Sequence, residues 1–393
     1  MIAQAASKLR RSIARRMVAR RSVALAPVAL KIAHRKYAST AFREIHAHRT
    51  LEKAGVAGCA HLTQLVEAFP HDGHVCIAFR LHGRDLSRAI PRRGMSIADA
   101  KHITRQLLQG LDTMHSAGFI HTDVKPGNVL YDPVTRVARL ADLGLATPTL
   151  TDGEEVATCD YTPPEGILGT SMTAPIDMWS LGCTIYKLLT GELLFDPWRA
   201  CQEKYQEFDG DAEPESSKSP DDESDRAVDP GQPKAGEVAG GKYLLKRRLG
   251  EGKFGVVWHA VPLHDDPVPT PSATEFLEQE RARRAAEEPG PPRPRWDLYE
   301  VSICYEHLLQ MHQLLGPVPE ALTHGKWRSL FCNADGSLRF DAKIEPQPLA
   351  ERLAKKLPRS DAHAATEFIE TLLRYDPQLR PTALQALASR WLA

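Results

Sequence analysis

The chain has 393 residues, which is enough for two or three compact domains with sizeable cores. Lysine plus arginine number 50 and aspartate plus glutamate number 50, so bulk charge does not favour direct binding of nucleic acid. No apolar run approaches the roughly 18 residues of a membrane helix, so we expect no membrane span. The seven cysteines form no C-x-x-C pair, which predicts an intracellular protein with reduced thiols and no structural zinc.

The chain begins with a basic arm, residues 1–27, that contains no acidic residue. The first acidic residue of the whole chain is Glu44. An acid-free, arginine-containing start is similar to a mitochondrial presequence. Arginines also lie on the apolar stripe of the helix that this arm would form, so its amphipathy is imperfect. We therefore expect a solvated arm on a protein of the cytoplasm or nucleus, with mitochondrial import as the alternative.

Short apolar strands and amphipathic helices alternate between residues 28 and 198. Residues 28–32 and 75–79 are short apolar runs and are predicted to be strands. Residues 96–117 carry apolar side chains at helical spacing, which predicts a helix.

Residues 199–296 interrupt this alternation. Twelve acidic and five basic residues lie between 199 and 240, where so little apolar surface cannot offset chain entropy. We predict a disordered acidic linker there. Residues 241–260 recover strand character, and the chain from 297 to 393 is predicted to be helical with loops.

Three polar motifs contain the residue types that phosphoryl transfer needs: a carboxylate near the attacking hydroxyl, ligands for Mg²⁺ and cations on the phosphates. Asp123 would orient the substrate hydroxyl and accept its proton, and Lys125 would neutralise the transferring phosphate. Asn128 and Asp142 would hold Mg²⁺. The motifs are His121-Thr-Asp-Val-Lys-Pro-Gly-Asn128, Asp142-Leu-Gly144 and Pro163-Pro-Glu165.

With these motifs the chain resembles the eukaryotic-type protein kinases, and most closely the serine/arginine-rich (SR) protein kinases. The latter resemblance rests on His-Thr-Asp in place of His-Arg-Asp and on the runs His74-Val-Cys-Ile-Ala-Phe79 and Arg105-Gln-Leu-Leu-Gln-Gly-Leu-Asp112. It implies a two-lobed α+β fold with a small β-rich lobe, a large, mainly helical lobe and a long insertion in the large lobe. It also implies use of MgATP to phosphorylate serine or threonine in protein substrates, including arginine/serine-rich ones.

The resemblance implies an ATP site in the small lobe. Lys31, in Val28-Ala-Leu-Lys31, would grip the α- and β-phosphates, and Glu44 would pair with it from a helix. The other implied ATP-binding positions are Ala29, Phe79 as the gatekeeper, Leu81 in the hinge and Leu130 on the adenine floor.

The resemblance also bears on activation. Thr122 stands where most kinases carry an arginine that requires a phosphate on the activation segment, and threonine has no such requirement. We therefore expect the segment from Asp142 to Glu165 to need no phosphorylation. Thr158 resembles the threonine that serine/threonine kinases place near the catalytic aspartate, and Arg380 would pair with Glu165 as part of the large-lobe scaffold.

The glycine-rich loop is displaced in the sequence. No glycine precedes residue 28, whereas Gly250-x-Gly252-x-x-Gly255-x-Val257 lies in the insertion, with strand-like flanks that would let backbone N–H groups approach phosphates and Val257 cover the adenine. Either this unit folds back to complete the small-lobe sheet, or the gene order is scrambled and the small lobe never assembles. We favour fold-back, because the linker is long enough to cross a kinase.

The predicted organisation leaves a rival function open. A catalytically impaired pseudokinase or scaffold is favoured by the displaced loop, whereas the intact catalytic and metal positions favour the enzyme. A small-molecule kinase of similar fold is a weaker third alternative. The predicted parts are the arm at 1–27, a small lobe lacking its first two strands at 28–82, the large lobe at 83–198 and 297–393, and the insertion at 199–296 with its glycine-loop unit at 241–260.

Two departures leave the preference for arginine-rich substrates open. Thr162 and Pro163 occupy the neighbourhood in which related kinases carry an arginine before Pro-Glu. Gln313 stands where SR-protein kinases tend to carry an acidic residue near their docking groove.

Overall fold

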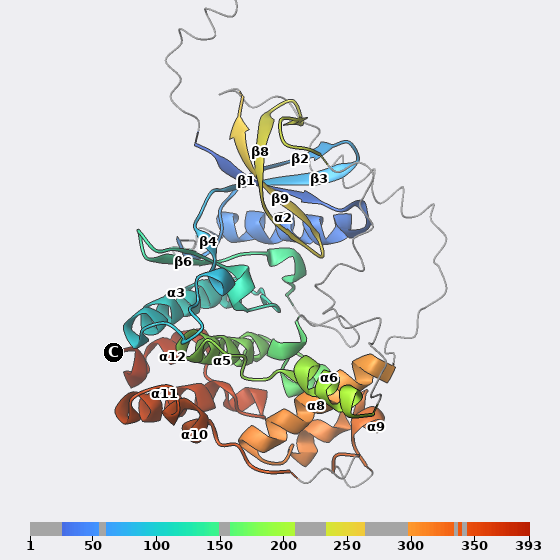
Figure 1. Ribbon diagram of the computed structural model, residues 1–393. Coiled ribbons are helices and arrows are strands. Elements are labelled where there is room, and N and C mark those ends of the chain that lie inside the picture. The colour runs from blue at the N-terminus through green and yellow to red at the C-terminus, as the bar shows by residue number, and fades with distance from the viewer. Residues whose placement is uncertain are drawn as a thin grey trace, which may run out of the picture.

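The computed structural model describes residues 26–54, 60–148, 158–208, 233–263, 298–333, 337–339 and 344–393. A small lobe contains a six-stranded sheet and one long helix, and a large lobe below it is mainly helical (Figure 1). The predicted two-lobed α+β architecture is confirmed. Most of residues 1–27 lie outside the described residues, so the expected arm stays a prediction.

The elements follow the chain in an order that visits the small lobe twice. The small lobe contains β1 (Val28–Ala33), α2 (Ala38–Lys53), β2 (Leu65–His71), β3 (His74–Arg80), β7 (Val238–Ala239), β8 (Tyr243–Gly252) and β9 (Gly255–Pro262). The large lobe contains β4 (Arg84–Asp85), α3 (Ile97–Ser116), β5 (Val129–Asp132), β6 (Val137–Leu140), α4 (Pro164–Leu168), α5 (Pro175–Thr190), α6 (Pro197–Phe208), α8 (Leu298–Leu315), α9 (Arg328–Phe331), α10 (Leu349–Ala354), α11 (Arg359–Leu372) and α12 (Ala383–Leu387).

The sheet of the small lobe joins strands that are far apart in sequence. Its order is β2-β3-β1-β9-β8-β7, and all paired neighbours are antiparallel. The register of β1 with β9 runs from Val28 opposite Ala260 to Ala33 opposite Gly255. The glycine-loop unit therefore lies beside β1, as in the fold-back arrangement that we favoured, and its strands extend beyond residues 241–260.

Each face of this sheet has its own apolar core, because successive side chains of a strand point to opposite faces. On one face, β1 contributes Val28, Leu30 and Ile32 to a cluster shared with β3, β8 and β9. On the other face, α2 packs its apolar side chains against β3. Helix α2 thus covers one face of the sheet, and the apolar side chains that β8 and β9 share with β1 and β3 lie on the other face.

The large lobe is organised around α3 and α5. Ser96 caps α3 by accepting a hydrogen bond from the backbone N–H of Asp99 at 3.1 Å, as N-cap serines do. The helix predicted over residues 96–117 is therefore confirmed. In α5, Trp179 is fully buried and stacks on Phe195. Among the described residues, no helix has the length and apolar character needed to cross a bilayer.

The prediction that the disordered linker begins at residue 199 is wrong. Residues 199–208 belong to α6, which packs against α8. Cys201 is buried there, and Lys204 pairs with Glu306 of α8 at 2.5 Å. The composition of this segment did not predict a helix, because its average polarity is high. Contacts with α8 stabilise the helix in spite of that polarity. Residues 209–232, which include most of the acidic run, lie outside the described residues.

A buried ion pair joins distant parts of the large lobe. Arg380 donates two hydrogen bonds to the carboxylate of Glu165, at 2.5 and 2.8 Å, and both side chains are buried. Its guanidinium also donates to the carbonyl oxygen of Pro175 and lies over the ring of Trp179. The predicted pairing of Arg380 with Glu165 is confirmed.

We expect Arg380→Met to destabilise the fold by about 3–5 kcal/mol, because it leaves a buried carboxylate without its partner. Urea unfolding of the purified protein measures this change. Arg199→Ala is the control, since it breaks an exposed pair with Glu203 and should change the free energy of unfolding little. Equal effects of the two substitutions would contradict the prediction.

Candidate active site

Lys31 joins the two lobes at the centre of the candidate site. Its ammonium group lies 2.8 Å from Glu44 Oε2 on α2 and 2.7 Å from Asp142 Oδ1 of the large lobe. Lys31 and Glu44 are buried, whereas the Asp142 side chain is 30% exposed. The pair of Lys31 and Glu44 that we predicted is therefore formed, and Asp142 shares the same ammonium.

The pKa values of this cluster reflect two carboxylates that share one cation. Burial alone would lower the pKa of Lys31, but Asp142 and Glu44 outweigh it and raise that pKa. Burial would raise the pKa of Asp142, but Lys31 holds it below its usual value. Burial raises the pKa of Glu44 to about 7 against the attraction of Lys31. Asp142 is therefore the more firmly ionised carboxylate of the two.

Asp142 projects from a backbone that few residues adopt. Its φ of 61° lies in the left-handed region, which costs a non-glycine residue energy and recurs at functional sites. Two residues later, a Cβ on Gly144 would lie 2.7 Å from Thr40 Cγ2. Glycine at this position therefore lets the Asp-Leu-Gly segment approach α2, which carries Glu44.

Three side chains hold the carboxylate of Asp123. Its Oδ1 accepts a hydrogen bond from Thr158 Oγ1 at 3.0 Å, and its Oδ2 accepts one from Asn128 Nδ2 at 2.7 Å. The ammonium of Lys125 lies 3.0 Å from the same Oδ2 and also donates to Thr158 Oγ1. The structure thus brings together Asp123, Lys125 and Asn128 of one motif, and it places Thr158 beside Asp123 as the resemblance implied.

Asp177 holds the loop that carries Asp123. Its two buried carboxylate oxygens accept the backbone N–H groups of His121 and Thr122, each at 2.8 Å, and His115 Nε2 lies 2.8 Å away. These bonds hold Thr122 at a φ of 72°. The run Asp177-Met-Trp-Ser180 resembles part of the large-lobe scaffold of protein kinases, but its hold on the loop of Asp123 was not predicted.

Asn128 and Asp142 present oxygen atoms that suit a hard cation. The amide nitrogen of Asn128 donates to the backbone and side chain of Asp123, which leaves the amide oxygen on the opposite side. Asp142 adds a partly exposed carboxylate. No cluster of three histidine, cysteine or acidic ligands forms within the described parts of the chain. This set fits Mg²⁺, which commonly takes one or two protein oxygens together with phosphate and water.

The sheet register places part of the glycine-rich segment beside Lys31. Lys31 on β1 lies opposite Val257 on β9, and Val257 lies opposite Gly250 on β8. Residues more than two hundred positions apart thus become neighbours across three strands. Their contact with a nucleotide stays a prediction.

The three glycines of this segment have different surroundings. A Cβ on Gly255 would lie 2.4 Å from the carbonyl oxygen of Ile32, so only glycine lets the hairpin approach β1 this closely. At Gly250 and Gly252 a Cβ would meet no atom within 4 Å. Those two positions therefore border open space, as a phosphate-binding loop requires.

The predicted adenine-binding positions are distributed over both lobes. Ala29 on β1 lies opposite Phe79 on β3, and Phe79 is buried with its ring 5.2 Å from that of His48. Leu81 follows β3 and is 36% exposed, and Leu130 is half-buried on β5. Burial lowers the pKa of His48 to about 3, so this ring is neutral at pH 7. The roles of the four predicted positions, Ala29, Phe79, Leu81 and Leu130, in adenine binding stay predictions.

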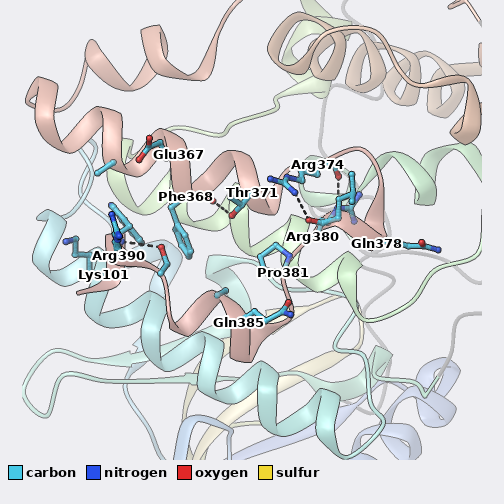
Figure 2. Close-up of a pocket in the computed structure, with 15 residues that line it drawn as sticks. Lys101, Glu367, Phe368, Thr371, Arg374, Gln378, Arg380, Pro381, Gln385 and Arg390 are labelled. Atoms are coloured by element: carbon cyan, nitrogen blue, oxygen red, sulfur yellow. Dashed lines mark hydrogen bonds between the residues drawn. The ribbon is translucent and has the colours of Figure 1, made fainter.

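A separate cavity of about 710 Å³ lies in the large lobe between α11, α12 and the start of α3 (Figure 2). Its lining includes Lys101, Phe368, Arg374, Gln385 and Arg390. The predicted catalytic and metal positions are not among its lining residues, so it is not the candidate active site.

Comparison with known proteins identifies the family to which this chain is similar. The family described as "Protein kinase domain" matches residues 12–229, more than half of the chain. Serine/threonine-protein kinase prp4 of Schizosaccharomyces pombe is 32% identical over 163 residues, which cover 39% of this chain and 33% of that protein. Human dual specificity tyrosine-phosphorylation-regulated kinase 3 is 33% identical over 169 residues, covering 41% and 28%.

A third similar protein is cell division control protein 2 homolog 2 of Trypanosoma brucei brucei, 34% identical over 164 residues, which cover 40% of this chain and 46% of that protein. The matches therefore span less than half the length of each of these relatives. The family match ends before Gly250, so it does not include the glycine-rich segment.

We expect Glu44 to make stability depend on pH. Its pKa is about 7 in the folded chain and near 4.5 without these surroundings, so the folded state binds the proton more tightly. The stability that Glu44 contributes is therefore present at low pH and is lost as the pH rises from about 4.5 to about 7. Thermal unfolding of the protein and of Glu44→Gln between pH 5 and 8 measures this contribution.

The difference in melting temperature, protein minus variant, should fall between pH 5 and 7 and level off above that range. Glu52→Gln is the control, because this glutamate lies on the same helix and is exposed. A difference for Glu44→Gln that stays constant over the whole range would show that Glu44 does not titrate there.

Proposed function

The chain belongs to the protein kinase family, and on this premise we propose that it transfers the γ-phosphoryl group of MgATP to serine or threonine hydroxyls of protein substrates. The observation that supports this most is the set of contacts to Asp123 from Lys125, Asn128 and Thr158. A carboxylate held in this way can orient a hydroxyl for in-line attack, which is the main requirement of phosphoryl transfer.

In the proposed reaction Asp123 acts on the protein substrate. Its carboxylate would accept a hydrogen bond from the serine or threonine hydroxyl and take up the proton as the new P–O bond forms, while the bond between the γ-phosphorus and the β,γ-bridging oxygen of ATP breaks and ADP leaves. Lys125, which already contacts this carboxylate, would offset the negative charge of the transferring group. Thr158 would hold Asp123 Oδ1 in place.

Lys31 would act on the nucleotide. The ion pair with Glu44 fixes its ammonium in a buried position, from which it would bind the α- and β-phosphates. Asn128 and Asp142 would hold Mg²⁺, which supplies positive charge on the phosphate oxygens. Gly250, Gly252 and Gly255 would cover the phosphates with backbone N–H groups, and Ala29, Phe79, Leu81, Leu130 and Val257 would enclose the adenine.

The rival reading as a pseudokinase or scaffold loses its main support. That reading rested on the displaced glycine-rich segment, and β9 pairs with β1 in a regular antiparallel register. Arginine/serine-rich substrates remain part of the proposal on the resemblance alone.

The state of the cysteines supports a reducing intracellular compartment. Among the described cysteines six are free thiols, as expected in such a compartment.

We expect Asp123→Asn to reduce phosphotransfer at least about 100-fold while leaving ATP affinity nearly unchanged, because it removes the proton acceptor and not the phosphate contacts. Transfer of radiolabelled phosphate to a generic basic protein and binding of a fluorescent ATP analogue measure the two effects. Asp99→Asn, at an exposed pair with Arg136, is the control. An unchanged transfer rate in Asp123→Asn would refute the proposed role.

We also expect phosphatase treatment to leave activity unchanged. Thr122 replaces the arginine that would need a phosphate, and its hydroxyl donates to the backbone carbonyl of Leu145. Neutral partners leave no buried positive charge at this position for a phosphate to neutralise. Activity after treatment is compared with a mock treatment using inactivated phosphatase, and a tenfold loss would contradict the expectation.

A further inference from the structure

The strands that complete the small-lobe sheet reach it from the large lobe. We call residues 233–263, which carry β7, β8 and β9, the glycine module, and the rest of the chain the body. The described residues next to the module along the chain are the end of α6 at 208 and the start of α8 at 298, and both helices lie in the large lobe (Figure 1). The position of the module in the small lobe therefore depends on non-covalent contacts with the body.

The first contact zone is a strand ladder. β9 pairs with β1 over six consecutive positions, from Val28 opposite Ala260 to Ala33 opposite Gly255. Without the module, β1 would become an edge strand with a row of unpaired backbone groups. Docking of the module therefore satisfies the backbone of the body as well as its own.

The second zone joins strands near the two ends of the sheet order, because the curl of the sheet brings the start of β8 to β2. Lys242 Nζ lies 2.7 Å from Glu67 Oε2, and Tyr243 donates its hydroxyl to Glu67 Oε1 at 2.6 Å. The ring of Tyr243 stacks on Phe69 with centroids 5.6 Å apart. One carboxylate of the body thus receives two groups of the module.

The third zone surrounds the tip of the hairpin. His34 donates its backbone N–H to the carbonyl oxygen of Phe254 at 3.0 Å, and the ring of Phe254 meets Tyr37 edge-on at 5.3 Å. Between these zones, Leu245, Val256 and Trp258 of the module enter one apolar cluster with the body. The interface thus resembles the packed core of a domain, although no short connection in the chain enforces it.

This interface also passes through the candidate nucleotide site. Lys31 belongs to the body, whereas Val257 and Gly250, which follow it across the sheet, belong to the module. Under the proposed function, a nucleotide held by Lys31 and covered by the glycine-rich turn contacts both parts at once. A ligand that binds the docked state better than the undocked state must shift the equilibrium toward docking.

We propose that the glycine module is a separable part that docks on the body through these three zones, and that nucleotide binding and module docking reinforce each other. The second half rests on the proposed function. In the intact chain the tethers keep the module at a high effective concentration near the body, so docking predominates. Cutting both tethers exposes the intrinsic affinity of the interface.

The test uses the full-length protein with one protease site introduced in residues 209–232 and another in residues 264–297. After cleavage, the module carries a fluorophore at its new end, and its dissociation on dilution is followed by anisotropy with and without saturating MgADP. We expect the module to remain bound after gel filtration, and MgADP to lower its dissociation constant at least tenfold. Release without measurable affinity in both conditions would overturn the proposal.

Two substitutions outside the proposed nucleotide-binding positions sharpen this test. Glu67→Gln weakens the second contact zone and should raise the dissociation constant of the module about tenfold. Glu192→Gln is the matched control, since it breaks an ion pair with Lys356 within the large lobe and should leave module binding unchanged. Equal effects of both variants would show that the second zone does not hold the module.

Hydrogen exchange of the uncut protein gives a second measurement that does not depend on cleavage. MgADP should slow amide exchange in β1, β8 and β9 more than in α11. Neither measurement uses phosphotransfer, so a protein that binds MgADP but transfers no phosphate fails the proposed function and not this inference. A module that docks but whose dissociation constant does not change with bound MgADP, or a body that binds MgADP equally well with and without the docked module, would overturn the coupling.

Discussion

The buried ammonium of Lys31 is the interaction on which the two-lobed site depends. The lysine and its two partners come from three different parts of the fold, since β1 carries the lysine, α2 carries Glu44 and the large lobe carries Asp142. A buried lysine without a partner would strongly destabilise the fold. The strand, the helix and the Asp-Leu-Gly segment must therefore be packed together for the lysine to be buried. The relative position of the lobes is therefore tied to one charge.

A buried charge that needs partners also positions the loop of Asp123 in the large lobe. Asp177 is buried and would be costly without partners, and the backbone N–H groups of His121 and Thr122 supply them. That arrangement fixes the backbone from which Asp123 projects toward Lys125 and Asn128. Farther along, the buried pair of Glu165 and Arg380 anchors the end of the activation segment. Buried charges thus place both halves of the site.

Most of the site could be predicted from the sequence because its motifs are local. Asp123 and Asn128 lie within one loop, and the pairing of Lys31 with Glu44 was implied by the resemblance to protein kinases that these motifs carry. The interface of the glycine module could not be predicted in the same way. Lys242 and Glu67 are 175 positions apart, and only the curl of the sheet brings them together. The helical start of the acidic run also depends on contacts with α8 that its composition does not show.

The position of the module shows how far chain order can differ from sheet order. A strand ladder requires only that the backbone edges meet in register, and the entropy of closing a long loop grows slowly with its length. The displaced segment therefore forms the same antiparallel neighbours that a segment preceding β1 could form. We expect the difference to lie in dynamics, because an element that docks through an interface can open with the free energy of that interface, whereas buried core helices typically open with the whole fold. Val257 and Gly250 lie on such an element, so under the proposed nucleotide binding we expect this side of the site to be the part whose order depends most on what is bound there.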